Sequence, residues 1–189
     1  IVVKASGLAA GKGLYVCQTL EQAEIALRHI KIERVFGAAG DEVLIEQCLA
    51  GEETSLLAFC DGSTVVPMLP ARDYKRIGDG DRGPNTGGMG CYAPSPYLPP
   101  ELVEEAMVRV LQPTVDGMRR RGTPYKGVLY AGLMLTEQGM RVLEFNCRFG
   151  DPETQVLLPL LDSDLVAICQ ACIDGSLSPP DVQWKSKHT

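Results

Sequence analysis

The chain has 189 residues, of which 45% are hydrophobic and 22% are charged, with a net charge of −6 and a pI near 5.0. This length and composition are enough to bury a hydrophobic core in one domain or slightly more. The acidic balance argues against a nucleic-acid partner, because proteins that follow a phosphate backbone carry a basic surface. No run reaches the roughly 18 apolar residues of a membrane span. We therefore expect neither a nucleic-acid nor a membrane partner.

The cysteine and histidine content limits the chemistry further. The seven cysteines are odd in number and scattered through mostly apolar segments, which favours reduced thiols and a cytosolic protein. Cys169 and Cys172 form a CxxC pair inside a helical pattern, which favours core packing over zinc binding. With only His29 and His188 present, a histidine-based metal site or a Ser-His-Asp triad is nearly excluded. Because the chain starts at Ile1 in a strand-like run, we expect it to be a piece of a longer protein.

The first thirty residues predict a β-hairpin followed by a helix. Strands are expected over 1–5 and 14–17, with a glycine-rich turn over 7–13 between them. Thr19 to Gln22 form a capping box, and apolar residues repeat at helical spacing behind it. A helix is therefore expected directly after the hairpin.

The rest of the chain predicts a mixture of strands and helices, which makes the fold class α+β. In chain order the expected elements are strands over 43–48, 54–60 and 64–69, a helix over 101–121 disturbed at Pro113, a strand hairpin over 128–136 and 140–146, and helices over 152–161 and from a Ser163 cap to Asp174. Regular structure is expected to stop between 70 and 100, and a loop of that length inside a compact domain is usually functional.

The glycine-rich turn over 7–13 carries a lysine at each end but is not a P-loop. A P-loop has four residues between its glycines, a Ser or Thr after the lysine and a helix next. Here three residues separate Gly7 from Gly11, Gly13 follows Lys12, and a strand comes next. Bare backbone N–H groups together with Lys4 and Lys12 could still close over a polyphosphate. The alternative is an ordinary glycine hairpin with solvated lysines.

The strand over 140–146 ends in a group of polar side chains. Because side chains alternate along a strand, Glu144 and Asn146 share one face, about 6.6 Å apart. Two oxygen donors on a rigid edge suit Mg²⁺, which takes its other ligands from water and phosphates. Arg148, just past the strand, could clamp a phosphate with its planar guanidinium. A surface loop with a chance ion pair is the alternative.

Two weaker signals lie between these segments. Glu46 and Glu53, seven residues apart, lie where a strand ends and could accept hydrogen bonds from adenosine, although solvated acids would look the same. The long loop contains three cations and one acid over 72–76 and exposed backbone donors over 85–90. Together these could hold an anionic substrate, although a solvated charge run is the more common case for the first.

Four motifs together resemble one enzyme family. They are RFGDPETQ at 148–155, GPNTGGMG at 83–90, KASGLAAGKG at 4–13 and EFN at 144–146. They resemble the phosphoribosylamine–glycine ligases, which are ATP-grasp enzymes. The resemblance implies antiparallel sheets with flanking helices and ATP between two subdomains, present here as an incomplete fragment. It implies a small subdomain over 1–69, a large one over 70–175 and a linker over 176–189.

The resemblance also implies an activity in de novo purine biosynthesis. ATP would phosphorylate the carboxylate of glycine to glycyl phosphate, and the amine of 5-phosphoribosylamine would displace phosphate to give glycinamide ribonucleotide. Mg²⁺ would be the metal ion, with Mn²⁺ as a substitute. Family members carry further N- and C-terminal domains, so we expect this chain alone to bind ATP weakly without turnover. Whether the parent enzyme has one activity or several is open.

The resemblance assigns roles to individual residues. It implies ATP binding by Lys4, Gly7, Gly11, Lys12, Gly13, Glu46, Leu49 and Glu53. It implies binding of the amine substrate by Asp73, Lys75, Asn85, Thr86, Gly87, Gly88 and Met89. It implies metal binding by Glu144 and Asn146, stabilisation of the acyl phosphate by Arg148, and an orienting acid at Asp151. Ser6 and Tyr74 depart from the common family pattern and receive no role.

Two other functions stay open at this point. One is another ATP-grasp ligase that joins a different carboxylate and amine; RFGDPE with GPNTGGMG argues against it. The other is a nucleotide-binding module without catalysis. The joint presence of Lys4, Glu144 and Arg148 argues against a pure binder, because binding alone needs no clamp for a reacting phosphoryl group.

Overall fold

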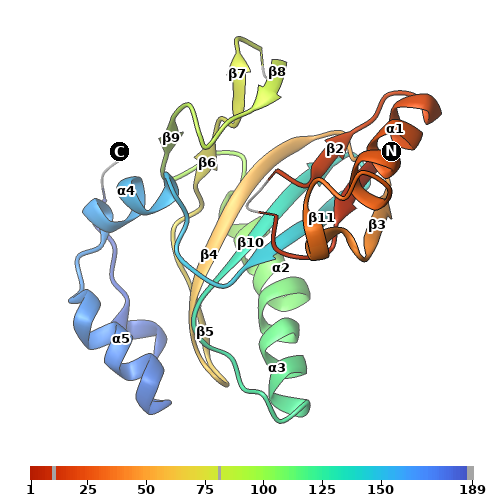
Figure 1. The fold of residues 1–189 in the computed structure, drawn as a ribbon. Helices are drawn as coiled ribbons and strands as arrows, with labels where there is room; N and C mark the ends of the chain where they lie inside the picture. Colours follow the sequence, from red (N-terminus) through yellow and green to blue (C-terminus); the bar gives the residue numbers. More distant parts are fainter. Residues whose placement is uncertain (10–11, 81, 187–189) are drawn as a thin grey trace. The chain divides into compact units, whose positions relative to one another are not determined.

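A computed structural model describes residues 1–9, 12–80 and 82–186, without the side chains of Pro84 and Asn85 (Figure 1). The chain divides into two compact units, Ile1–Ala50 and Gly51–Thr189. We call these unit 1 and unit 2 and describe each by itself.

Unit 1 is a small antiparallel sheet with one helix. Its strands β1, β2 and β3 are Val2–Ala5, Leu14–Val16 and Val43–Glu46, in the order β2-β1-β3. Helix α1 (Leu20–Lys31) buries Ala23, Ala26 and Ile30 in a core with Val3, and a short 3-10 turn, η1, spans Gly37–Gly40. The predicted cap is confirmed, because Thr19 Oγ1 accepts from the backbone N–H of Gln22 at 3.2 Å.

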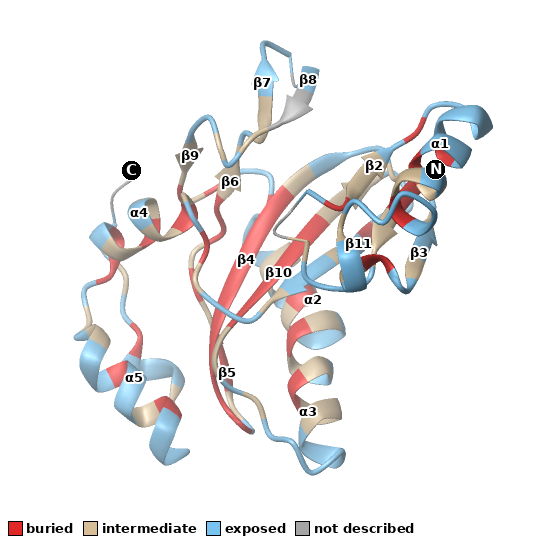
Figure 2. Cartoon of the chain, in the orientation of Figure 1, coloured by how far each residue is buried: buried red, intermediate tan, exposed pale blue. Residues whose placement is uncertain are grey.

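Unit 2 is built on a four-stranded antiparallel sheet in the order β11-β10-β4-β5. The strands are β4 (Glu52–Asp61), β5 (Val65–Pro67), β10 (Lys126–Thr136) and β11 (Gly139–Asn146). The central strands β4 and β10 are largely buried (Figure 2). The sequence explains this burial, since β4 contains the run Leu56 to Cys60, in which no side chain is more than 1% exposed.

Alternate side chains of the central strands enter two separate cores. Leu57 and Phe59 of β4 pack with helix α5, whereas Leu56 and Ala58 pack on the other face with α2 and α3. The helical elements of unit 2 are α2 (Pro100–Ala106), η2 (Met107–Leu111), α3 (Gln112–Arg120), α4 (Glu153–Leu157), η3 (Leu158–Leu160), α5 (Leu165–Asp174) and η4 (Pro179–Asp181). None of the helices in the described part of the chain has the length and apolar character that crossing a membrane requires.

The helix expected over 101–121 is disturbed one turn before its proline. Residues Met107–Leu111 form a π-helical turn between α2 and α3, and Pro113 then sits in the first turn of α3. A π turn shifts the backbone hydrogen-bond pattern, so it can accommodate a residue that lacks an N–H donor. The predicted disturbance is therefore confirmed, and its location is corrected.

The prediction that regular structure stops between 70 and 100 is wrong. This segment contains β6 (Arg72–Asp73), β7 (Arg76–Gly78), β8 (Arg82–Asn85) and β9 (Cys91–Tyr92). They form two small antiparallel pairs, β6 with β9 and β7 with β8. Two-residue strands carry too little alternation to be visible in the sequence. The segment therefore contains two hydrogen-bonded strand pairs.

The expected subdomains 1–69 and 70–175 stay a prediction, and the two compact units divide the chain at a different place. The sequence placed 1–69 together, but β4 and β5 pair with β10 in unit 2, and the division falls between Ala50 and Gly51. The segment from 176 onward is not a free linker in its described part, because Leu177 and Val182 are buried and Trp184 pairs with Leu161. Helix α5 is capped by Asp164, which accepts from Val166 N at 2.8 Å, and the predicted cap residue Ser163 instead accepts from Gln183 N at 2.8 Å.

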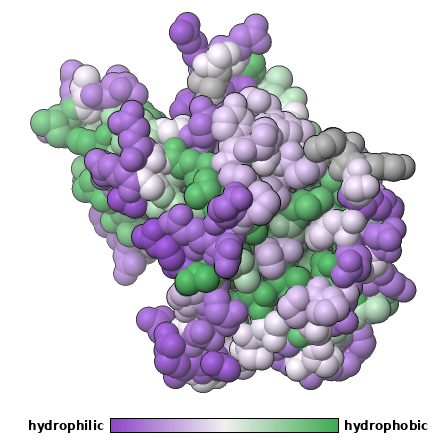
Figure 3. All heavy atoms as spheres, turned by 180° about the vertical axis from the view of Figure 1, so that it is seen from behind, coloured by the Kyte–Doolittle hydropathy of each residue, from purple (hydrophilic) through white to green (hydrophobic). Residues whose placement is uncertain are grey.

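Hydrophobic residues also remain on the surface. They lie among hydrophilic residues on the face opposite to that of Figure 1, in several separate groups (Figure 3). In unit 1, Leu44 and Ile45 of β3 are 49% and 64% exposed. Isolated apolar side chains at a surface are common and do not by themselves mark a binding site.

Candidate active site

Lys4, an expected ATP-binding residue, lies in the middle strand of unit 1. Its ammonium group forms an ion pair with Glu46 of the neighbouring strand β3, with 2.9 Å between Nζ and Oε2. The Lys4 side chain is 15% exposed, so its charge is held close to the sheet. Leu49, also expected near ATP, is half-buried after β3. Unit 1 therefore brings the side chains of Lys4 and Glu46 into direct contact, and their binding of ATP stays a prediction.

The glycine-rich turn of unit 1 is held by specific backbone contacts. Gly7 donates its N–H to Ala39 O at 2.9 Å, and a Cβ at this position would lie 2.5 Å from Ala39 Cα. Gly13 accepts from Ala5 N at 2.8 Å, which closes the turn, and the Lys12 side chain is exposed. The remaining expected ligand, Gly11, lies outside the described residues. Close backbone approach explains the glycine at position 7.

Glu144 and Asn146, the expected metal ligands, lie next to each other at the end of β11 in unit 2. Their side chains are on one face, with 3.4 Å between Asn146 Nδ2 and Glu144 Oε1. Turning the Asn146 amide by half a rotation would present its oxygen beside the carboxylate. Among the described residues no group of three or more His, Cys, Asp or Glu side chains could hold a metal ion. The donor set is thus one carboxylate and one amide, which suits an ion that keeps water and phosphate ligands.

The strand pairing explains how these two side chains are positioned. Glu144 lies opposite Gly132 and Asn146 opposite Tyr130 in the β10–β11 ladder, with a register shift between Gly132 and Leu133. A Cβ at Gly132 would lie 3.4 Å from Glu144 Cγ, so the glycine leaves the Glu144 side chain room. A bulge of this kind re-aims side chains near a strand end.

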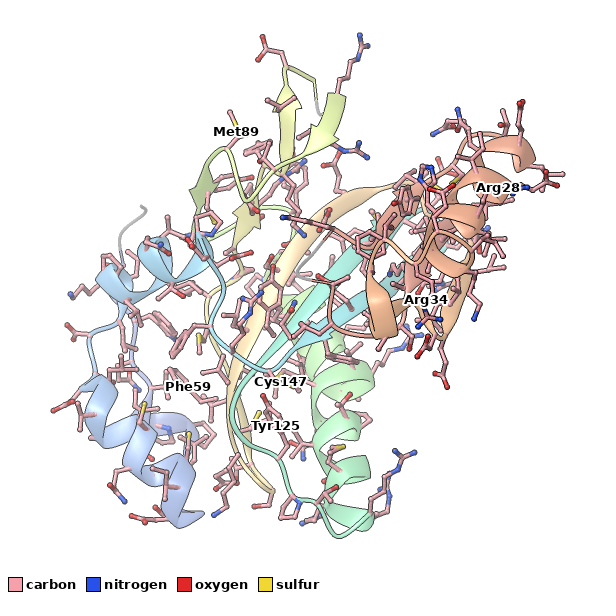
Figure 4. All side chains as sticks on the ribbon, in the orientation of Figure 1. Arg28, Arg34, Phe59, Met89, Tyr125 and Cys147 are labelled. Atoms are coloured by element: carbon pink, nitrogen blue, oxygen red, sulfur yellow. The ribbon has the colours of Figure 1, made fainter. Side chains whose placement is uncertain are left out.

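The loop after β11 carries the expected catalytic residues. Arg148 is exposed and donates from Nη1 to its neighbour Phe149 O at 2.7 Å. Cys147, which precedes it, is also exposed (Figure 4). Asp151 is exposed, accepts from Gln155 Nε2 at 2.8 Å, and is joined to Pro152 by a cis peptide bond. The structure therefore leaves both Arg148 and Asp151 available to solvent.

Glu53 and Lys75 form an ion pair in unit 2. The resemblance assigned Glu53 to adenosine and Lys75 to the amine substrate, so their direct contact was not expected. Burial alone would lower the pKa of Lys75, but the charge and hydrogen bond of Glu53, together with the nearby acids, outweigh burial, so the net pKa is raised. Glu144 also raises the pKa of Lys75. Lys75 therefore stays a cation in an acidic part of unit 2.

Hydrogen bonds join the segment 85–90 to Tyr74 and Lys75, which lie between β6 and β7. Thr86 donates both its N–H and its hydroxyl to Lys75 O, at 2.7 and 2.9 Å. Its hydroxyl oxygen also accepts from Gly88 N at 3.0 Å, and Met89 N donates to Tyr74 O at 2.8 Å. Gly87 is exposed, as is the Met89 side chain (Figure 4), and β8 ends at Asn85. These hydrogen bonds hold the segment as a turn that leaves backbone groups on the surface.

Asp73 lies beside this turn in β6 and has an unusual environment. Burial raises the pKa of its carboxyl group to about 6, and the charge of Glu153 adds to the increase, while Lys75 opposes it. Its Oδ1 atom is buried and has no hydrogen-bond partner within the described part of the chain. A Cβ on Gly88 would lie 2.9 Å from this oxygen. Such a carboxyl group is available to an incoming donor.

The charge run over 72–76 is not a solvated face. Arg72 forms an ion pair with Glu52, at 2.6 Å from Nη2 to Oε2, and its guanidinium lies over the rings of Tyr74 and Tyr97. The Arg72 side chain is only 13% exposed. Stacking on two rings together with an ion pair fixes the orientation of Arg72 and thus of the strand that carries Asp73.

The sequence did not indicate that Glu153, in the first turn of α4, is buried. Glu153 is 2% exposed, and its Oε1 accepts hydrogen bonds from Tyr130 at 2.5 Å and from Ser55 at 3.1 Å. In the sequence, Glu153 looks like a solvated acid in the first turn of a helix. The signal that could have found it is its place in RFGDPE three residues after Gly150, because a Cβ at Gly150 would lie 2.2 Å from Glu153 Oε2.

Residues 1–154 match the model of the family described as phosphoribosylglycinamide synthetase, ATP-grasp (A) domain. The chain is 56% identical over 189 residues to the trifunctional purine biosynthetic protein adenosine-3 of Homo sapiens, covering all of this chain and 19% of that protein. It is 51% identical over 187 residues to phosphoribosylamine–glycine ligase of Brucella melitensis, covering 99% of this chain and 44% of that protein.

A solved structure agrees with the sequence comparison. The phosphoribosylamine–glycine ligase of Thermotoga maritima aligns with a TM-score of 0.75 and 36% identity, over 93% of this chain and 44% of that one. The biotin carboxylase domain of the 2-oxoglutarate carboxylase of Hydrogenobacter thermophilus aligns with a TM-score of 0.70 at 18% identity, which shows a shared fold. The predicted α+β ATP-grasp fold is thereby confirmed. The chain belongs to the phosphoribosylglycinamide synthetase ATP-grasp (A) domain family.

Proposed function

We propose that this chain is the ATP-grasp part of a phosphoribosylamine–glycine ligase. In this reaction ATP phosphorylates the carboxylate of glycine, and the amine of 5-phosphoribosylamine displaces phosphate to give glycinamide ribonucleotide, ADP and phosphate. The observation that carries the proposal is the family match over residues 1–154, which includes Lys4, Glu144, Asn146 and Arg148. The name of the Brucella melitensis relative supports the choice of substrates.

The residues of unit 1 are proposed to hold ATP. The ammonium groups of Lys4 and Lys12 offer charge to the phosphates, and the glycines at 7 and 13 let the chain approach them closely. Glu46 holds Lys4 in place through its ion pair and can accept from a ribose hydroxyl or an amino group. Leu49 would contribute apolar contact to the adenosine.

Glu144 and Asn146 fit a magnesium ion by the chemistry of their donor set. When bound there, Mg²⁺ would neutralise the charge of the phosphoryl group during transfer. The chain's own part is to hold the two oxygen donors on one face of β11 at a fixed separation. Mn²⁺ as a substitute stays a prediction, as does a cytosolic location.

The residues around β6 are proposed to receive the amine substrate. The carboxyl group of Asp73 can accept from an amine, and Lys75 together with the backbone of the 85–90 segment can bind an anionic group. Glu53 stays a proposed adenosine contact, and its ion pair with Lys75 also holds that cation in place. Arg148 would stabilise the charge of the acyl phosphate, with Asp151 nearby in sequence as an orienting acid.

The chain spans 19% and 44% of the lengths of the human and Brucella relatives. We propose that its activity belongs to a longer protein and that the 189-residue chain alone binds ATP without turnover. The test is ADP formation by the full-length protein with glycine and 5-phosphoribosylamine. We expect ADP only when both are present. ADP formation with another carboxylic acid and none with glycine would contradict the choice of substrate, and multiple turnovers by the isolated chain would contradict the need for further domains.

A further inference from the structure

The carboxylate of Glu153 joins three elements of unit 2. It sits in the first turn of α4, and its Oε1 accepts from Tyr130 of β10 and Ser55 of β4. The hydroxyl groups of Ser55 and Tyr130 are 2.7 Å apart, so the three groups form a closed triangle. All three residues are buried, at 2% to 5% exposure. A buried carboxylate is costly unless it is hydrogen-bonded, and this one is held by two donors.

The Glu153 carboxylate occupies space that is free only because residue 150 is a glycine. A Cβ there would lie 2.2 Å from Glu153 Oε2 and 3.0 Å from Tyr130 Cε1. The loop that carries Arg148 and Asp151 therefore closes directly over the carboxylate. Any larger residue at 150 would push the loop and the acid apart.

The partners of Glu153 connect it to the two proposed binding regions of unit 2. Tyr130 lies opposite Asn146 in the β10–β11 ladder. Ser55 exchanges two backbone hydrogen bonds with Ala71, at 2.8 and 2.9 Å, and Ala71 lies two residues before Asp73. The triangle thus reaches the strand end that carries Asn146, the strand that carries Asp73 and the loop that carries Arg148.

We propose that Glu153 is a positioning residue: its buried carboxyl group, hydrogen-bonded to Tyr130 and Ser55, holds the Arg148–Asp151 loop against β10 and, through the pairing of Ser55 with Ala71, sets the surroundings of Asp73. This inference rests on the proposed function, since Asp73 and Arg148 matter there through the amine substrate and the acyl phosphate. Glu153 itself need touch no substrate.

The groups around Asp73 support an electrostatic part to this role. After burial, Glu153 is the largest influence that raises the pKa of Asp73, and Glu53 and Asp151 act in the same direction while Lys75 opposes them. Cys91, on the strand paired with Asp73, has its own pKa raised to about 12 by burial and then by Glu153 and Asp73, so it adds no charge near neutral pH. Removing the charge of Glu153 should therefore let Asp73 ionise at lower pH.

The first test compares three variants in the full-length protein. E153Q keeps the size of the side chain and a carbonyl oxygen but removes the charge; Y130F keeps the charge but removes a donor. E137Q, at an exposed position in the β10–β11 turn, is the matched control. We expect E153Q to lower kcat by about 10- to 100-fold and to move the acid limb of kcat/KM for the amine substrate down by roughly half to one pH unit. Y130F should lower kcat without moving the acid limb.

The second test does not depend on activity. The pH dependence of the Tm between about pH 4 and pH 7 should be smaller in E153Q than in the unchanged protein, because Asp73 then titrates closer to its ordinary value. In a D73N background the same E153Q change should alter this dependence less. This difference isolates the influence of Glu153 on Asp73 from every other effect of the E153Q change.

The outcomes separate the two hypotheses. Wild-type protein that makes no ADP from glycine and 5-phosphoribosylamine would contradict the proposed function, and the Tm measurements would still decide the influence of Glu153 on Asp73. The positioning role is overturned if E153Q behaves like E137Q in all measurements. It is also overturned if E153Q lowers the Tm but leaves both the acid limb and the pH dependence of the Tm unchanged, because Glu153 would then act through packing alone.

Discussion

Lys75 and Glu53 form an ion pair in unit 2 although they are 22 residues apart, and the resemblance had assigned them to different ligands. Glu53 lies on the central strand β4, and Lys75 follows the short strand β6, which carries Asp73. The contact therefore fixes the cation of the proposed amine site to the main sheet.

E53Q should weaken this attachment. Both side chains are about one-third exposed, so we expect the free energy of unfolding to fall by only about 0.5–1 kcal/mol, as measured by urea denaturation. The KM for the amine substrate should rise in the full-length protein, because Lys75 loses the partner that orients it. E105Q, which breaks an ion pair with Arg109 on the helix surface, is the control and should leave this KM unchanged. Equal KM values in the two variants would count against the assignment of Lys75.

Gly88 and Gly87 provide a matched pair of substitutions. Gly88 has a φ of +118°, and a Cβ there would lie 2.8 Å from Pro152 Cδ and 2.9 Å from Asp73 Oδ1, whereas nothing lies within 4 Å of a Cβ at Gly87. We expect G88A to lower the free energy of unfolding by about 1–3 kcal/mol and to raise the KM for the amine substrate. G87A should do neither. Similar urea midpoints for the two variants would contradict the close packing of this turn.

Asp73 should make stability depend on pH in a defined direction. Its pKa is raised from 3.8 to about 6 in the folded chain, so the folded state holds a proton that the unfolded state releases. The contribution of this group to stability is therefore largest below about pH 4 and is lost as the pH rises to about 6. D73N should remove this part of the dependence, as measured by urea denaturation at several pH values. An identical dependence in D73N and the unchanged protein would show that Asp73 does not titrate abnormally.

Replacing Glu144 should impair metal-dependent catalysis while sparing the fold. Glu144 is exposed on the edge strand β11, so E144Q should leave the Tm close to that of the unchanged protein. We expect kcat/KM in the full-length protein to fall by about 100-fold or more, because the ion would lose its carboxylate ligand. ADP formation measured across a range of MgCl₂ concentrations checks this, with E137Q as the control. An unchanged rate at every concentration would support a nucleotide-binding module without catalysis.

Several elements could be predicted because their signals are local. The Thr19 cap, the π-disturbed helix near Pro113 and the left-handed Gly175 that ends α5 each depend on residues within one or two helical turns. The paired placement of Glu144 and Asn146 follows from strand alternation alone, and the structure confirms that their side chains adjoin. The motifs identified the family for the same reason, since each is a short contiguous run.

The amino-acid pattern alone thus established the α+β elements, the family and the identity of the polar residues at the candidate site. Tertiary structure alone decided which of those residues meet: Glu53 pairs with Lys75, and Glu153 is buried against Ser55, 98 residues away, rather than solvated at a helix start. It also decided that β4 belongs with β10 and that the unit boundary falls after Ala50. The physical reason is that burial and long-range pairing depend on which strands come together, and a charged side chain has the same sequence signature whether water or a buried donor satisfies it.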